Sequence, residues 1–467
     1  MQARTETSPM GVNWIQRFGA ALALLALLAT LIATRALPTS PAAAAGPGQL
    51  SLSMVEMLDG ENSSGLVTLT ELREDILGKY AGLGQGDGVD VAVIDTGVAP
   101  VPGLDGDNLL HGPDLSMEGS SDKAAYLDTY GHGTHMAGII AGNRAGDLGI
   151  APDARIVSVK VAGHDGVTTV PQVVAAIDWV IDHRNTDGLN IRVLNLSLGQ
   201  AGVDTHVGDH LSAAVERAWH AGIVVVVAAG NGGEVQKHLD SPAIDPYVVA
   251  VGAVDSTDDD DDDRDERHVP SWSANGNGVR NPDMVTPGRS VASYRVPGST
   301  VDQAAPSARV GDDLFRGSGT SQSAAATSGV AAALLSMHPE LTPDQVKATI
   351  QKRSFDLDDT KGYRQGDGHL DGFAILNEVP ESKTKVDHDP AAGGNTGIVA
   401  PTGATWSGGT WSGGTWSGAT WSGATWSGGT WSGATWSGAT WSGATWSGAT
   451  WSGATWSGAT WSGATWS

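Results

Sequence analysis

The chain has 467 residues and a formal net charge of -25 at pH 7, and 40% of its residues are apolar. Such acidity argues against nucleic-acid binding, which needs a basic face. The absence of cysteine excludes disulfides and a thiol nucleophile. The apolar fraction is ample for a core, and the length allows up to about three domains.

The N-terminus predicts export. Between Arg17 and Arg35 lie 17 uncharged residues rich in Leu and Ala, and a stretch of small residues follows and ends near Ala45. This pattern is typical of an export signal that is cleaved after small residues. A run of 17 apolar residues is also at the lower limit for a membrane anchor, which stays open as the alternative. In both cases we expect the rest of the chain to lie outside the cytoplasm, secreted or at the cell surface.

The part of the chain after the signal is divided by its composition. Residues 46–74 are interpreted as a short N-terminal extension, and a helix is expected around Leu69–Tyr80. A main domain is expected over 75–378, a linker rich in Pro, Gly and Asp over 379–404, and a repeat tail over 405–467.

The main domain alternates strand and helix patterns. Apolar residues spaced by three and four predict helices over 170–181 and 211–219, and Thr342 followed by Pro343 begins a last helix. Runs rich in Val and Ile predict five buried strands, at Val89–Ile94, Arg155–Val161, Ile191–Leu196, Ile223–Ala228 and Val248–Val251. The predicted fold class is therefore α/β, a doubly wound, mostly parallel sheet with helices on both faces.

Three short blocks place catalytic residue types at the edges of these elements. Asp95 closes an apolar run predicted as a buried strand, whereas His132 and Ser321 each follow a glycine-bearing turn and open an Ala-rich helical stretch. In a parallel sheet the reactive crevice lies beyond the carboxyl ends of the strands, so the topology gathers Asp95 with the residues that follow Leu196 and Ala229. These types suit acyl transfer: the Ser attacks, the His takes and returns the proton, and the Asp orients the His.

The three blocks, and the segments between them, resemble the subtilisin-like serine proteases over roughly residues 75–355. The chain order Asp, His, Ser is the order found in subtilisin. The segments that carry the resemblance are Val91–Gly97, Gly131–His135, Gly149–Ala154, Leu196–Gly199, Ala228–Asn231, Val249–Ala253, Asn281–Gly288 and Gly317–Ala324. Eight collinear segments are far more specific than a single Gly-Thr-Ser motif.

The resemblance implies an endopeptidase that acts on protein or peptide substrates. Asp95, His132 and Ser321 would form the catalytic triad, and Asn231 would complete the oxyanion hole together with the backbone N–H of Ser321. The residues expected to line the substrate cleft are Ser197, Leu198, Gly199, Ala228, Ala229 and Gly230. No cofactor is expected in the chemistry, structural calcium is possible without a location, and the chain is expected to be a monomer.

Several residues near the triad have simpler interpretations. His135 follows His132 by three residues, but the pair lacks the Glu and the i,i+4 spacing of the zinc protease motif, so we expect no metal there and a packed or hydrogen-bonded His135. Asp128 is interpreted as an exposed turn residue. Ser323 is less suited to be the nucleophile than Ser321, which lies in the Gly-Thr-Ser block.

Much of the negative charge falls in one segment. Nine acidic residues lie between Asp255 and Glu266, and six of them are the consecutive Asp258 to Asp263. The calcium loops of proteins alternate carboxylates with other ligands and a glycine, and no such alternation exists here. A solvated, self-repelling loop is therefore expected rather than a cation site.

The last 63 residues are uncharged and consist of Thr-Trp-Ser-Gly-Ala/Gly in thirteen copies, the last one cut short. A period of five matches neither a helix nor a strand, and the glycine content favours a disordered, low-complexity tail. The alternative is a wall- or glycan-binding array, because Trp faces stack on sugars and many weak contacts add up; self-association also stays open. A surface-binding protein that keeps the protease fold only as a spacer is the other function class, and the presence of all three triad residues argues against it.

Overall fold

The computed structural model describes residues 49–52, 65–78, 84–116, 118, 127–256, 267–358, 360–378 and 380, and the short strands of the repeat tail. The expected signal (1–45), the run Asp258 to Asp263 and all but residue 380 of the linker lie outside the described residues. In the part of the chain that the structure describes, no helix combines the length and the apolar character needed to cross a membrane.

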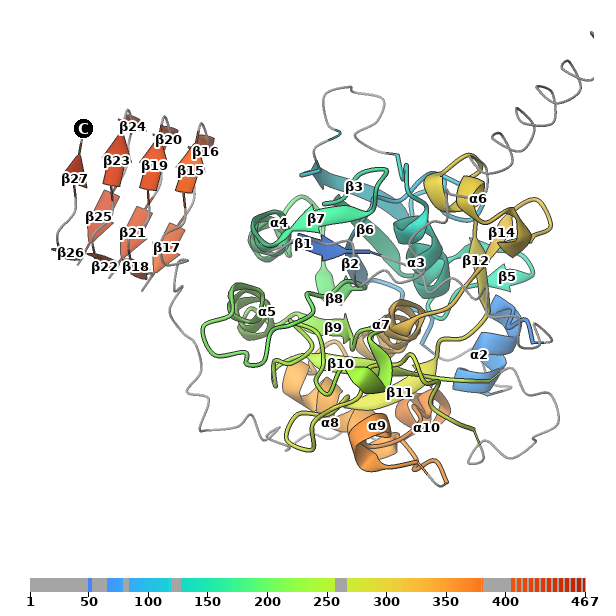
Figure 1. Ribbon diagram of the computed structural model, residues 1–467. Helices are drawn as coiled ribbons and strands as arrows, with labels where there is room; N and C mark the ends of the chain where they lie inside the picture. The colour runs from blue at the N-terminus through green and yellow to red at the C-terminus, as the bar shows by residue number, and fades with distance from the viewer. Residues whose placement is uncertain are drawn as a thin grey trace, which may run out of the picture. The chain divides into compact units, whose positions relative to one another are not determined.

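A parallel sheet of seven strands forms the centre of the main domain (Figure 1). Its strands, in spatial order, are β11 (Met284–Pro287), β10 (Val249–Val254), β9 (Val224–Ala228), β8 (Ile191–Leu196), β2 (Asp90–Asp95), β6 (Arg155–Lys160) and β3 (Leu109–Asp114). All neighbouring pairs are parallel. The predicted fold class is thus confirmed, and the five predicted strands are the five central ones.

Helices cover both faces of this sheet (Figure 1). On one face lie α4 (Val170–His183) and α5 (His210–His220), which pack against each other; on the other lie α3 (His132–Ala141) and α7 (Thr320–Met337). All four were expected from the sequence, α4 and α5 from their apolar stripes and α3 and α7 from the Ala-rich stretches that follow glycine-bearing turns. Helix α7 is buried along nearly its whole length, because its Ala, Ser, Thr and Gly side chains allow it to cross β8, β9 and β10 closely.

Shorter elements complete the main domain. The last predicted helix is α8 (Pro343–Arg353), and its capping residue Thr342 forms a capping box with Gln345. The remaining elements are the α-helices α6 (Thr300–Ala304), α9 (Gly362–Gln365) and α10 (Gly372–Asn377), the 3-10 helices η2 (Gly233–Val235) and η4 (Pro306–Ala308), the hairpin of β4 (Asn143–Arg144) and β5 (Asp147–Leu148), and the small sheet of β12 (Val291–Tyr294), β14 (Leu314–Gly317) and β13 (Arg309–Val310).

The segment before the main sheet is part of the same body. Strand β1 (Gln49–Ser51) pairs antiparallel with β7 (Val167–Thr169), and α2 (Leu69–Leu77) buries Leu69, Leu72 and Ile76. The boundary expected at residue 75 falls inside α2, so this helix and the sheet form one unit.

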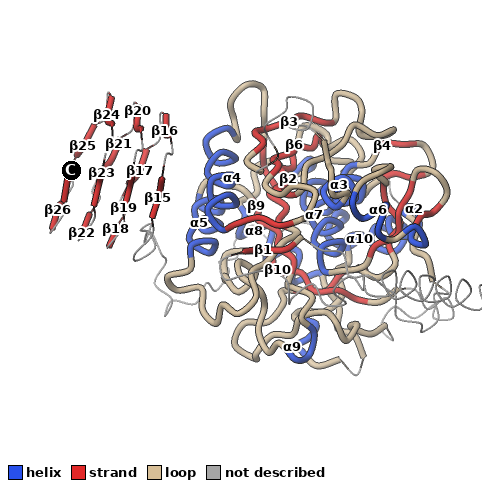
Figure 2. Tube along the Cα trace, turned by 45° about the horizontal axis from the view of Figure 1, so that its top comes forward, coloured by secondary structure: helices blue, strands red, loops and turns tan. Residues whose placement is uncertain are grey.

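The repeat tail forms short parallel strands, which corrects the expectation of a disordered tail. Each Thr-Trp-Ser triplet is a strand, one every five residues from β15 (Thr405–Ser407) to β27 (Thr465–Trp466). Each strand pairs with the strand four repeats later, as Trp406 does with Trp426, and the strands build four small sheets, whose rows Figure 2 shows. Paired strands lie 20 residues apart, which is four repeats, so identical residues face each other in register. The sequence argument compared the five-residue period only with a single strand and therefore did not predict this pairing.

Candidate active site

Asp95 and His132 form a buried pair at the carboxyl edge of the sheet. Asp95 is the last residue of β2, and His132 is the first residue of α3, which packs against β2. His132 Nδ1 lies 2.8 Å from Asp95 Oδ1 and 3.0 Å from Asp95 Oδ2. Gly133 allows this approach, because a Cβ at that position would lie 3.1 Å from Asp95 Oδ1. The pair that the sequence predicted is therefore brought together, with Nδ1 facing the carboxylate.

The surroundings of His132 favour its charged form. The ring is fully buried, which by itself lowers the pKa of His132, but the charge and hydrogen bond of Asp95 and the charge of Asp128 outweigh burial and raise it above its ordinary value. His132 Nε2 is buried and has no hydrogen-bond partner among the described residues. The arrangement leaves one ring nitrogen free to accept a proton and stabilises the imidazolium that results.

Asp128 is buried, which corrects its interpretation as an exposed turn residue. It is 1% exposed, and its carboxylate accepts hydrogen bonds from Thr96 Oγ1 (2.8 Å), Gly131 N (2.6 Å), Thr134 N (2.8 Å) and Thr134 Oγ1 (2.7 Å). Thr96 in turn binds Asp95 Oδ1 through its backbone N–H (2.8 Å). Asp128 thus connects the residue after β2 to the start of α3 and stabilises the relative position of Asp95 and His132.

Ser321 lies in the first turn of α7, the helix that packs against α3. Its Oγ does not bind His132; it donates to the backbone oxygen of Ser197 at 3.2 Å. The Ser197 hydroxyl donates back to the backbone oxygen of Ser321 at 3.1 Å. The structure therefore anchors Ser321 at the end of β8, and the hydroxyl uses a single weak bond that a rotation about its χ1 angle would release.

Asn231 lies beside the start of α7, as predicted. Its Oδ1 accepts hydrogen bonds from the backbone N–H of Thr320 (2.9 Å) and from Thr320 Oγ1 (3.0 Å). The same hydroxyl accepts a hydrogen bond from the N–H of Gly230 at 3.1 Å. Because its oxygen is held by Thr320, the amide NH₂ of Asn231 is left as a donor beside the start of α7.

The six residues predicted to line the cleft follow the ends of two neighbouring strands, β8 and β9. Ser197, Leu198 and Gly199 come directly after β8, and Ala228, Ala229 and Gly230 form the end of β9 and its continuation. All six are buried except Gly199, which is partly exposed. The hydrogen bonds of Ser197 and Gly230 described above connect both segments to the first turn of α7.

His135 is a structural residue, as expected. It is fully buried, and its Nε2 lies 3.0 Å from the backbone oxygen of Phe315. Burial, followed by the charge of His132, lowers the pKa of His135 to about 3, so the imidazole is neutral. Within the described ranges, no group of three or more His, Asp or Glu side chains is arranged to hold a metal ion.

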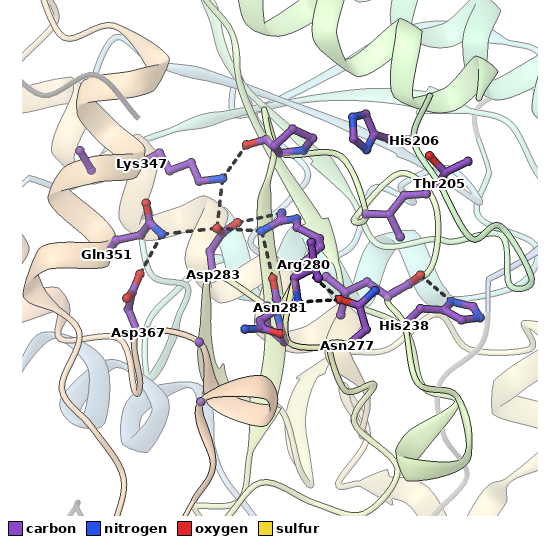
Figure 3. Close-up of a pocket in the computed structure, with 18 of the residues that line it drawn as sticks. Thr205, His206, His238, Asn277, Arg280, Asn281, Asp283, Lys347, Gln351 and Asp367 are labelled. Atoms are coloured by element: carbon purple, nitrogen blue, oxygen red, sulfur yellow. Dashed lines mark hydrogen bonds and ion pairs between the residues drawn. The ribbon is translucent and has the colours of Figure 1, made fainter. Parts of the chain in front are cut away.

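A separate cavity of about 860 Å³ lies at the opposite, amino-terminal ends of β10 and β11 (Figure 3). The ammonium group of Lys347 is buried there between Asp283 Oδ1 (3.1 Å) and the backbone oxygens of Pro246 (2.9 Å) and Val248 (2.6 Å). Arg280 Nη1 lies 3.0 Å from the same Asp283 oxygen. The bonds of Lys347 attach α8 to the residues that precede β10 and β11, and Asp283 pairs with both Lys347 and Arg280.

The chain is similar to known proteins over most of its main domain. Residues 86–374 match the Subtilase family. Serine protease AprX of Bacillus subtilis (strain 168) is 36% identical over 303 residues, which are 62% of this chain and 65% of AprX. Subtilisin DY of Bacillus licheniformis is 32% identical over 290 residues, 60% of this chain and 89% of that protein.

A solved structure shares the fold. Fervidolysin from Fervidobacterium pennivorans, described as a keratinolytic enzyme related to subtilisin, aligns with a TM-score of 0.55 at 24% identity. The alignment covers 72% of this chain and 52% of fervidolysin. The chain thus spans about half the length of fervidolysin and just under two thirds of the length of AprX.

Proposed function

We propose that this chain, which belongs to the subtilase family, is an exported serine endopeptidase that hydrolyses peptide bonds through an acyl-enzyme. The observation that carries the proposal is the buried Asp95–His132 pair with a free His132 Nε2, on a helix that packs against the helix with Ser321 in its first turn. Family membership supports the reaction class, and the geometry supports the assignment of roles.

In the proposed mechanism Ser321 is the nucleophile. Its hydroxyl turns from Ser197 O toward His132 Nε2, which takes the proton as Oγ attacks the carbonyl carbon of the substrate. The backbone N–H of Ser321 and the amide of Asn231 donate to the oxyanion that forms. Asp95 keeps the proton of the neutral ring on Nδ1 and stabilises the imidazolium.

In the remaining steps His132 acts first as an acid toward the leaving amine and then again as a base toward water. His132 returns its proton to the leaving amine, and the C–N bond breaks to give the acyl-enzyme and a new amino terminus. A water molecule then gives a proton to His132 and attacks the ester carbon, and Ser321 leaves with that proton. Extended substrate backbone would pair along the segments that follow β8 and β9.

A pair of matched variants tests this assignment. Ser321→Ala is expected to lower kcat on casein or a peptide substrate by at least about 10³-fold. Ser323→Ala is the control, because Ser323 is also buried in the first turns of α7 but its hydroxyl is bonded to Thr286 O at 2.8 Å. Hydrolysis that survives Ser321→Ala, or that is lost equally in both variants, would contradict the proposed nucleophile.

For the repeat tail we propose binding to a glycan surface such as a cell wall. In-register strands repeat one Trp position along each small sheet, for example Trp406, Trp426 and Trp446, which suits many weak sugar contacts. Removal of residues 405–467 should leave peptide hydrolysis unchanged and abolish sedimentation with insoluble wall polysaccharide. Retention of the truncated protein on that material would refute this role.

A further inference from the structure

A carboxylate closes the space between the two segments that flank Ser321. It belongs to Asp240, which lies in the loop between β9 and β10. The inference drawn from it concerns the substrate class and rests on the proposed function.

The backbone around Asp240 joins both walls of the cleft. Asp240 N donates to Ala229 O at 3.0 Å, which attaches this loop to the segment after β9. The next residue, Ser241, exchanges two hydrogen bonds with Gln200, at 2.8 and 3.0 Å, which attach the loop to the segment after β8. Residues 240 and 241 therefore connect the segment 197–200 to the segment 228–230, the two expected walls of the substrate cleft.

Both walls are glycine where the Asp240 side chain passes. A Cβ at Gly230 would lie 2.7 Å from Asp240 Cγ, and a Cβ at Gly199 would lie 2.7 Å from Asp240 Cβ and 3.2 Å from its Oδ2. Such distances are too short for carbon atoms, so any larger residue would collide with the carboxylate. The two glycines leave the space in which this side chain points between the walls.

The carboxylate is only half satisfied. Gln236 Nε2 donates to Asp240 Oδ1, and within the described part of the chain no Lys or Arg pairs with Asp240. Oδ2, the oxygen that faces the glycines, receives no hydrogen bond from the described residues. Burial raises the pKa of Asp240, and the charge of His238 opposes the rise. A substrate cation that reaches Oδ2 would supply the missing partner in a charge-assisted hydrogen bond.

We propose that Asp240 is the specificity-determining residue of this enzyme and selects substrates with Lys or Arg on the amino side of the cleaved bond. The side chain at that position enters the pocket beside the nucleophile, and a carboxylate at the base of such a pocket is how trypsin selects basic residues. Here the carboxylate of Asp240 lies between the two cleft walls. One wall binds Ser321 through Ser197, and the other binds Thr320 through Gly230.

The test uses the full-length enzyme and two peptides that differ in one group. One carries Lys before the cleaved bond and the other norleucine, which has the same chain without the ammonium group. We expect kcat/KM to favour the Lys peptide, and Asp240→Asn to reduce the Lys to norleucine ratio by about 10- to 100-fold, the value of a hydrogen bond to a charged group. Asp204→Asn is the matched control, because Asp204 is 89% exposed and only approaches His238 of the same loop, at 3.8 Å.

The outcomes separate this inference from the proposed function. A wild-type enzyme that prefers norleucine, or a ratio that Asp240→Asn leaves unchanged, would overturn the role of Asp240 while Ser321-dependent hydrolysis stands. An equal drop in both Asp variants would reduce the effect to general surface charge and would also overturn it. A folded chain that hydrolyses neither peptide would overturn the proposed function and this inference together.

Discussion

Replacement of Asp128 by Asn tests how the Asp95–His132 pair is held. The carboxylate of Asp128 accepts four hydrogen bonds, two on each oxygen. An Asn side chain offers one oxygen and one NH₂ group. If the oxygen keeps Thr96 and Gly131, the NH₂ faces the backbone N–H of Thr134, and two donors then point at each other.

The structure sets the size of the effect. Asn loses at least the bond from the Thr134 N–H and weakens the one from its hydroxyl, and hydrogen bonds to a charged group contribute about 1.5–3 kcal/mol each. Because the neutral amide also avoids part of the cost of burying a charge, we expect the free energy of unfolding to fall by about 2–3 kcal/mol. The same change loosens Thr96 and α3, so kcat should fall by about tenfold or more, since misplaced catalytic groups react slowly.

The stability assay is urea unfolding followed by Trp fluorescence, in a Ser321→Ala background so that autolysis does not remove the unfolded chain. Asp107→Asn serves as the control, because Asp107 carries the same charge on an exposed loop. If Asp128→Asn unfolds at the same urea concentration as the parent, or no earlier than Asp107→Asn, the buried network does not hold this edge of the sheet.

Three further predictions concern the site and the core. Asn231→Ala should lower kcat with little change in KM; in subtilisin itself the loss of this type of oxyanion donor costs about 10²–10³ in kcat, and a loss confined to KM would contradict the role. The pH profile of kcat/KM should fall on the acid side as His132 becomes protonated, and Asp95→Asn should move this limb of the residual activity to lower pH, because it removes a group that raises the pKa of His132; an unmoved limb would contradict the pairing. Burial raises the pKa of Asp245 from 3.8 to about 8; the N–H of Tyr247 opposes this rise and the charge of Glu216 adds to it. Between these two pH values the folded state binds more protons than the unfolded state, so the free energy of unfolding falls as the pH rises from about 4 to about 8. Asp245→Asn should therefore be more stable than the parent near pH 9, by at least about 1 kcal/mol, and not near pH 4; equal effects at both pH values, measured by urea unfolding, would contradict this.

The sequence predicted the central sheet because its strands are continuous Val and Ile runs, which leave little doubt about burial. The two edge strands were missed for physical reasons. Strand β3 contains Gly112 and Pro113 and is only partly buried, and β11 ends with Pro287, a residue confined to edge strands and strand ends because it cannot donate to the ladder. Neither has the apolar run on which the other five were recognised.

The positions of the proposed catalytic residues were predictable, whereas the residues that support them were not. Asp95, His132 and Asn231 lie where their motifs indicated, because each follows a strand end or opens a helix. Asp128 was misjudged, since its partners Thr96 and Thr134 lie on two different elements and only the packing of α3 against β2 brings them to one carboxylate. The position of the Asp240 side chain was not predictable, because it depends on a loop that connects to both cleft walls.

Covalent labelling of the full-length chain with a fluorophosphonate, located by peptide mass spectrometry, tests most directly whether Ser321 is the nucleophile. We expect one modified residue, Ser321, and no labelling of the Ser321→Ala variant, because Ser321 is the proposed nucleophile in the first turn of α7, the helix that packs against the His132 helix α3. A folded chain that is not labelled, or that is labelled at Ser323 or another serine, would contradict this assignment.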